Sequence, residues 1–141
     1  MAWNIAFDKI KPYLLRINTE NGFGTGFLFG FNKDHSLAAI ATAAHVVQHS
    51  HNWRKPIKIG HYDSRQIEFY NEERRVIWLD TSKDAATILV HASSLPFPSS
   101  TLPIMDHTKY KSIGVEIGWV GFPSIVPDDL CFFSGKIDHV P

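Results

Sequence analysis

The chain has 141 residues and a mass of 16.0 kDa, which is the size of one ordinary domain. Hydrophobic residues make up 44% of it and charged residues 20%, a balance that excludes an intrinsically disordered chain. Fourteen basic residues balance fourteen acidic ones, so no net positive field attracts nucleic acid or a membrane surface, and neither partner is expected. The densest basic spot, Arg74 and Arg75, directly follows Glu72 and Glu73 and is predicted to be solvated.

The single cysteine, Cys131, cannot form an internal disulfide, which fits a reducing compartment. The first ten residues lack the apolar core and the cleavage site of a secretory signal. No window approaches the roughly 18 uninterrupted apolar residues that a membrane span needs. A cytoplasmic protein is therefore expected.

Seven short segments rich in β-branched and aromatic residues are separated by glycine, Asn-Gly or charged clusters. They are residues 13–19, 23–31, 36–42, 57–61, 66–70, 76–79 and 87–91. This pattern favours an antiparallel all-β barrel or sandwich over alternating β-α units. In the second segment, Phe23, Thr25, Phe27, Phe29 and Phe31 occupy alternate positions, which predicts that this row faces the interior.

The sequence after the seventh segment predicts a connector followed by two further strands. Residues 93–100 carry two prolines and four serines, which predicts an extended connector. Beyond it, residues 115–120 and 131–137 read as two further strands. We expect residues 1–95 to form an N-terminal β-barrel and residues 96–141 a connector with the first strands of an incomplete second barrel. A hairpin of this kind is marginal alone, and its exposed strand edges favour self-association.

Two residues from different segments are the candidates for chemistry. His45 follows three small residues at the end of a predicted strand, and Asp84 directly precedes another strand. A carboxylate that accepts the Nδ1 proton of an imidazole sets the tautomer and leaves Nε2 as a general base. If the fold brings them together, His45 and Asp84 form such a pair.

Five motifs in order resemble those of the trypsin-like serine peptidases, closest to the bacterial heat-shock and glutamyl-endopeptidase-like members. The matching segments are residues 24–27 (Gly-Thr-Gly-Phe), 42–45 (Thr-Ala-Ala-His), 84–90 (beginning Asp-Ala-Ala), 114–123 (ending Gly-Phe-Pro) and 133–137 (Phe-Ser-Gly-Lys-Ile). The resemblance covers about residues 13 to 140. It implies a trypsin-like Greek-key fold of two barrels, the first complete here and the second partial.

The same resemblance implies that His45 is the general base of a Ser-His-Asp triad and Asp84 its orienting carboxylate. The Gly-x-Ser-Gly-Gly loop that supplies the family's nucleophile and oxyanion hole does not occur in the 141 residues. We therefore expect the N-terminal portion of a serine endopeptidase, cut before that loop, needing no cofactor and inactive alone. Its partner would be a peptide or protein substrate. The alternative is a catalytically inactive peptidase-fold module that binds a peptide or a partner protein.

Other sites are less well supported by the sequence. Ser134 matches a strand rather than a nucleophile turn, and the apolar neighbours of Cys131 predict a buried, inert thiol. His49 and His51 follow His45 at short spacing, but they fall in a segment that reads as a polar loop, so no metal site is predicted. The glycines of residues 22–26 alternate with period two, unlike a dinucleotide-binding loop, so no nucleotide cofactor is expected.

Overall fold

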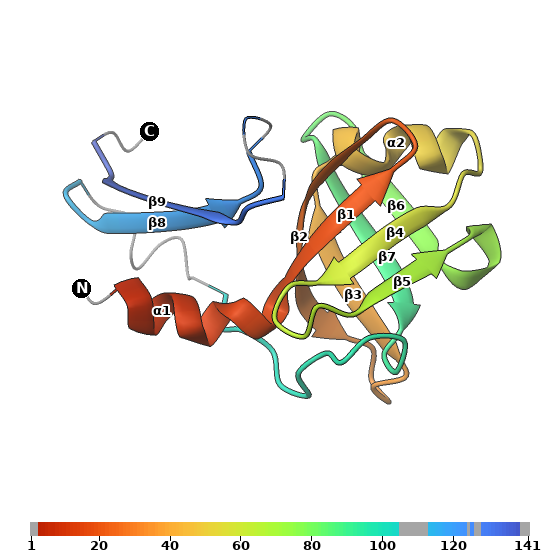
Figure 1. Ribbon diagram of the computed structural model, residues 1–141, viewed down its shortest axis with the longest axis horizontal. Coiled ribbons are helices and arrows are strands. Elements are labelled where there is room, and N and C mark those ends of the chain that lie inside the picture. The colour runs from red at the N-terminus through yellow and green to blue at the C-terminus, as the bar shows by residue number, and fades with distance from the viewer. Residues whose placement is uncertain (1–2, 105–112, 124, 126–127, 139–141) are drawn as a thin grey trace. The chain divides into compact units, whose positions relative to one another are not determined.

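The computed structural model describes residues 3–104, 113–123, 125 and 128–138. The chain folds into two compact units, Ala2–Leu102 and Pro103–Pro141. The first unit contains a seven-stranded antiparallel sheet that curls around its own core, and the second contains a two-stranded sheet (Figure 1). The predicted all-β fold class, an antiparallel barrel with a smaller second sheet, is confirmed.

The seven strands of the first unit begin and end within two residues of their predicted positions. They are β1 (Leu14–Thr19), β2 (Gly22–Phe31), β3 (Leu37–Thr42), β4 (Ile57–His61), β5 (Ile67–Tyr70), β6 (Val76–Asp80) and β7 (Ala85–His91). Their order in the sheet is β5-β4-β1-β2-β3-β7-β6. Strands β1 to β3 form a meander, and β4 returns to pair with β1, which is the Greek-key arrangement.

The two strands at the ends of the sheet, β5 and β6, are consecutive in sequence, but the described sheet does not pair them with each other. Residues 71–75, including the short helix η2 (Glu72–Arg74), connect β5 to β6. Here the Arg75 guanidinium donates to the carbonyl oxygens of Tyr70 (2.8 Å) and Ser50 (3.2 Å). The prediction of a solvated Arg75 is wrong, since this residue is only 9% exposed. Its donors reach one carbonyl at the end of β5 and one in the helix that follows β3, and so join the connection to that helix.

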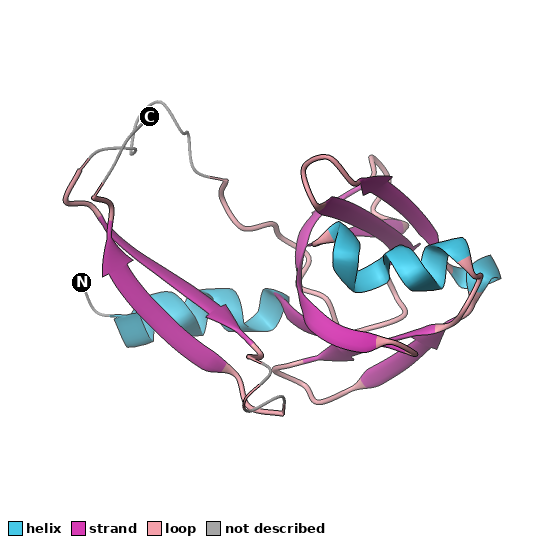
Figure 2. Cartoon of the chain, turned by 90° about the horizontal axis from the view of Figure 1, so that it is seen from above, coloured by secondary structure: helices cyan, strands magenta, loops and turns pink. Residues whose placement is uncertain are grey.

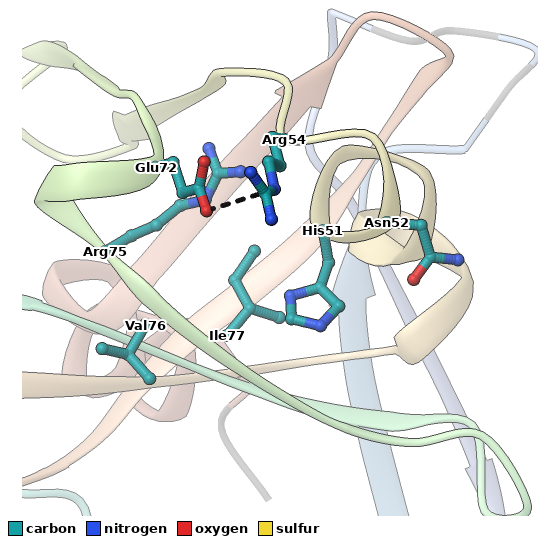
Figure 3. A pocket seen from close by; sticks show the side chains of 7 residues that line it. All are labelled: His51, Asn52, Arg54, Glu72, Arg75, Val76 and Ile77. Atoms are coloured by element: carbon teal, nitrogen blue, oxygen red, sulfur yellow. Dashed lines mark ion pairs between the residues drawn. The ribbon is translucent and has the colours of Figure 1, made fainter.

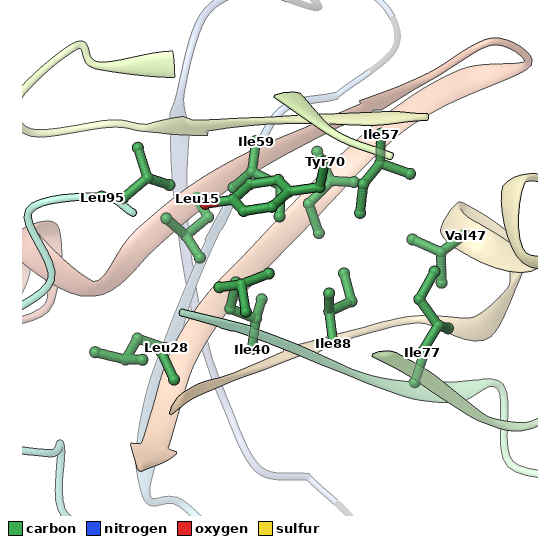
Figure 4. Close-up of a cluster of buried hydrophobic side chains, with 14 of the residues drawn as sticks. Leu15, Leu28, Ile40, Val47, Ile57, Ile59, Tyr70, Ile77, Ile88 and Leu95 are labelled. Atoms are coloured by element: carbon green, nitrogen blue, oxygen red, sulfur yellow. The ribbon is translucent and has the colours of Figure 1, made fainter. Parts of the chain in front are cut away.

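Side chains from both ends of the sheet meet in one hydrophobic core (Figure 4). Ile57 and Ile59 of β4 alternate inward and are fully buried, as Ile88 of β7 is. Val47 enters the same cluster from a helix. Each fully buried aliphatic side chain contributes about 1.5–3 kcal/mol relative to an exposed one. This alternation is the signal that made the strands predictable from the sequence.

The phenylalanine row of β2 does not face inward as predicted. Leu28 lies opposite Ile40 and is fully buried, whereas its neighbour Phe27 is 40% exposed. A β-bulge between Leu28 and Gly30 then shifts the register, so that Phe31 packs against the core. One extra residue in a strand reverses which side chains face the core, so Phe31 faces inward although Phe27 does not. A regular alternation in the sequence therefore cannot place the whole phenylalanine row on one face.

Helix α2 (Ala44–Asn52) replaces the loop that was predicted for His49 and His51. Its buried residues Ala44, Val47 and Ser50 recur every three positions, and this stripe packs beside the curved strands of the first unit (Figure 2). The loop prediction is wrong because tertiary packing of one narrow face stabilises a helix whose overall composition is polar.

A second helix, α1 (Trp3–Ile10), precedes the barrel and continues into the 3-10 helix η1 (Lys11–Tyr13). Its sequence of eight mixed polar and apolar residues is too short to predict a helix. Within the described part of the chain, no helix has the length and apolar character needed to cross a bilayer.

The segment after β7 packs onto the barrel rather than running as an extended connector. Leu95 is buried in the core cluster, and the hydroxyls of Ser94 and Tyr70 lie 2.7 Å apart. Phe97 and Leu102 also pack against the cluster. The predicted extended conformation is wrong for residues 93–96, which form turns.

The second unit is an antiparallel hairpin of β8 (Glu116–Gly121) and β9 (Cys131–Lys136), close to the two predicted strands. The rings of Trp119 and Phe133 stack at 5.8 Å, and both side chains remain exposed. Cys131 is only partly buried, so the prediction of a buried thiol is wrong. The residues of β9 are exposed or only partly buried along its whole length.

Gly24 and Gly30 provide a matched test of the packing between β2 and α2. A Cβ at Gly24 would lie 2.4 Å from the Val46 side chain of α2, whereas a Cβ at Gly30 would meet no atom within 4 Å. Gly24→Ala should lower the free energy of unfolding by about 1–3 kcal/mol, because the helix must move. Gly30→Ala should change it by less than about 0.5 kcal/mol. Urea denaturation measures both, and equal effects would contradict the proposed packing.

Candidate active site

His45 lies in the first turn of α2, directly after β3. The residues before it, Ala43 and Ala44, are small, and the N-cap Ala43 has no side chain that can accept a hydrogen bond. A hydrogen bond of 2.9 Å from the Thr42 hydroxyl to the Thr25 carbonyl joins the end of β3 to β2 just before the helix. The imidazole therefore emerges from a well-anchored strand end, with 74% of the side chain exposed.

Asp84 occupies the last position of the turn between β6 and β7. Its φ of +51° lies in the left-handed region, which aspartate tolerates better than most residues. Asp80 organises the same turn, accepting hydrogen bonds from the Ser82 hydroxyl (2.7 Å) and the Lys83 N–H (3.2 Å). This local geometry directs the Asp84 carboxylate toward α2.

The structure brings the two predicted residues into direct contact through two hydrogen bonds. Oδ2 of Asp84 lies 2.6 Å from Nδ1 of His45, and Oδ1 accepts the backbone N–H of His45 at 2.9 Å. An ionised carboxylate can only accept, so Nδ1 carries the proton and the neutral ring presents Nε2 as an acceptor. This is the tautomer that a general base requires.

The carboxylate of Asp84 also serves as the missing cap of α2. The first N–H groups of a helix have no partner within the helix, and Ala43 cannot supply one. Asp84 supplies the acceptor from another part of the chain, at the end of the helix where a negative charge is favoured. These hydrogen bonds lower the pKa of Asp84; the backbone N–H of His45 is the main cause and its side chain the second.

A second histidine–carboxylate pair, which the sequence analysis did not identify, lies one turn along the same helix. Nε2 of His49 is 3.3 Å from a carboxylate oxygen of Glu20, in the turn between β1 and β2. The i, i+4 spacing of His45 and His49 was visible in the sequence, but their separate partners were not. Among the described residues, no three His, Cys, Asp or Glu side chains gather closely enough to hold a metal ion.

The other nucleophiles considered in the sequence lie in the second unit. Ser134 is within β9, opposite Gly118. Cys131 begins the same strand, with its sulfur 3.9 Å from the Asp129 carbonyl oxygen. Neither residue is in a turn between a strand and a helix.

Comparison with known proteins identifies a fold but no family. No family model matches the chain, and neither does any curated protein. A solved structure of a mutant of Rv3671c from M. tuberculosis H37Rv, in an inactive form, matches with a TM-score of 0.64 and 17% sequence identity. The match covers 96% of this chain and 55% of the other, so this chain spans about half of that length. The likeness shows that this chain shares the fold of that structure, a trypsin-like fold.

The pKa of Asp84 tests the geometry of the pair. In the folded protein it should titrate below the ordinary value of 3.8, so its stabilising hydrogen bonds are present above that pH and are lost as the pH falls through the lower folded value. His45→Ala should restore the pKa only in part, because the backbone N–H remains. Carboxyl ¹³C NMR titration measures it.

Asp34 is the internal control for this titration. Its pKa is also lowered, mainly by the Ser36 hydroxyl, and Ser36 precedes β3 whereas His45 follows it. His45→Ala should leave Asp34 unchanged, and Ser36→Ala should move Asp34 alone. A full return of Asp84 to 3.8 in His45→Ala would mean that the backbone hydrogen bond is not formed.

Proposed function

We propose that this chain is the N-terminal portion of a trypsin-like serine endopeptidase, with His45 as the general base and Asp84 as its orienting carboxylate. The observation that carries the proposal is the 2.6 Å contact between Nδ1 and the Asp84 carboxylate, within a trypsin-like fold. A buried structural histidine would have both ring nitrogens occupied, as His61 does with the Ser64 hydroxyl and the Pro12 carbonyl. His45 instead leaves its ring 74% exposed.

In the proposed reaction, a serine hydroxyl attacks the carbonyl carbon of a peptide bond while Nε2 of His45 takes its proton. The tetrahedral intermediate collapses, the C–N bond breaks, and the imidazolium returns the proton to the leaving amine. Water then repeats the sequence on the acyl-enzyme and regenerates the serine. Asp84 remains ionised throughout and stabilises the imidazolium that forms at each proton transfer.

The serine and the oxyanion hole of this mechanism lie outside these 141 residues in our proposal. No Gly-x-Ser-Gly-Gly segment occurs in the sequence, and the chain spans 55% of the solved structure that it resembles. A single oxyanion-hole donor is worth about 3–4 kcal/mol of transition-state stabilisation, and the nucleophile is indispensable for covalent catalysis. Residues 1–141 alone should therefore be inactive. The substrate class is a peptide or protein segment, and no cofactor takes part.

An active-site probe tests the proposal on the full-length product of the reading frame that contains this chain. A fluorophosphonate should label the wild type at a serine that follows Pro141, and His45→Ala should abolish labelling. Asp84→Asn should reduce the rate by about 10⁴-fold, because the carboxamide favours the wrong tautomer. Gel fluorescence and intact-mass measurement report the modification.

His35→Asn is a suitable control, since His35 lies in an exposed turn with a φ of +58° that asparagine tolerates. It should label as the wild type does. Folded full-length protein that shows no labelling, or a reading frame without a glycine-flanked serine, would instead favour the inactive peptidase-fold module that binds a peptide or partner.

A further inference from the structure

An open groove of about 520 Å³ lies between the end of α2 and the start of β6 (Figure 3). Neither His45 nor Asp84 lines it, so it is separate from the candidate active site. The residues of this groove that matter here are His51, Arg54, Glu72, Arg75, Val76 and Ile77.

The groove carries more positive charge than its own acidic residue balances. Arg54 lies 3.6 Å from Glu72, and both side chains are more than half exposed. The guanidinium of Arg75 is hydrogen-bonded to two neutral carbonyl oxygens, and no carboxylate of the described residues pairs with it within 4.0 Å. Burial lowers the pKa of Arg75, as expected for a cation removed from water, and the nearby charges of Glu72 and Glu73 oppose this effect. A ligand carboxylate would compensate for this lost hydration.

The backbone at Arg54 lies in the left-handed region, where arginine is not the residue that folding favours. Arg54 has a φ of +54° directly after the C-cap of α2, and the Lys55 N–H donates to the Ser50 carbonyl at 2.9 Å. This is the Schellman arrangement, in which glycine is strongly preferred at the left-handed position. An arginine there is conformationally unfavourable, and its side chain lies beside Glu72 in the groove (Figure 3).

Strand β6 offers an extended partner both a backbone and an apolar surface. It is an end strand of the sheet, so alternate N–H and C=O groups along it face away from its partner β7. On its outer side, Val76 is 60% exposed and Trp78 is 65% exposed. On its inner side, Ile77 lines the groove, two residues from Arg75.

We propose that this groove docks an extended segment of a partner protein that carries an acidic side chain between apolar residues. The segment pairs with the free edge of β6, its carboxylate contacts Arg54 and Arg75, and its alternate apolar side chains cover Val76 and Trp78. The charge of the groove selects the acidic residue, and the outward row of β6 selects the apolar ones. The proposal does not depend on the proposed peptidase activity.

Fluorescence anisotropy with residues 1–141 tests the proposal. The probe is a fluorescein-labelled peptide, acetyl-Val-Thr-Val-Glu-Val-Thr-Val-amide, compared with the same peptide in which Gln replaces Glu. The Glu peptide should bind roughly tenfold more tightly, because only its carboxylate forms charge-assisted hydrogen bonds. Equal affinities would overturn the proposal. A third peptide has Gln in place of Glu and a free C-terminal carboxylate in place of the amide. If it binds more tightly than the Glu peptide, the choice of an acidic side chain is overturned.

Arg54→Gly separates binding from folding. Glycine suits the left-handed position, so the melting temperature should stay the same or rise, while most of the preference for the Glu peptide is lost. Lys33→Gln removes one positive charge in the turn between β2 and β3 and should retain the preference. His45→Ala should also retain it, which separates this proposal from the peptidase. An unchanged preference in Arg54→Gly would overturn the role of this residue.

A second copy of the chain is the competing occupant of the β6 edge. Light scattering coupled to size exclusion should show a monomer at the concentrations of the anisotropy experiment. A dimer that Val76→Lys dissociates would mean that β6 pairs with itself, and this would overturn the assignment to a partner protein.

Discussion

The carboxylate of Asp84 holds the backbone N–H and the ring of His45 at the same time. One oxygen caps a helix whose own N-cap residue is alanine, and the other sets the proton on Nδ1. The stability of α2 and the chemical state of the imidazole therefore depend on one side chain from the turn between β6 and β7. The position of α2 depends in turn on Gly24, where the helix approaches β2 too closely for a Cβ.

Helix α2 connects the two surfaces to which we assign function. His45, which pairs with Asp84, lies at the beginning of the helix. Arg54, which lines the groove beside β6, lies just after the end of the helix. Arg75 anchors that end, since it donates to the Ser50 carbonyl of the helix and to the Tyr70 carbonyl of β5. The same contacts join the connection between β5 and β6 to helix α2. A structural arginine thus leaves a buried positive charge next to an open groove.

This chain shares its fold with a solved structure at 17% sequence identity. Alternating burial along short strands, glycine at close approaches and one bulge in β2 all contribute to the curled sheet. The site requires more, since a hydrogen bond of 2.6 Å between His45 of α2 and Asp84 of the turn between β6 and β7 tolerates little displacement. Function must consequently be argued from the His45–Asp84 geometry rather than from the fold.

From the sequence alone, the strands and their antiparallel class could be determined, because alternation and turn residues are local signals. The order of the motifs also identified His45 and Asp84 as candidates for one pair. The tertiary structure decided the rest: the bulge that turns Phe31 toward the core while Phe27 stays exposed, the burial of Arg75, the helical state of His49 and its pairing with Glu20. Each of these depends on contacts between residues far apart in the chain, and such contacts override local preference.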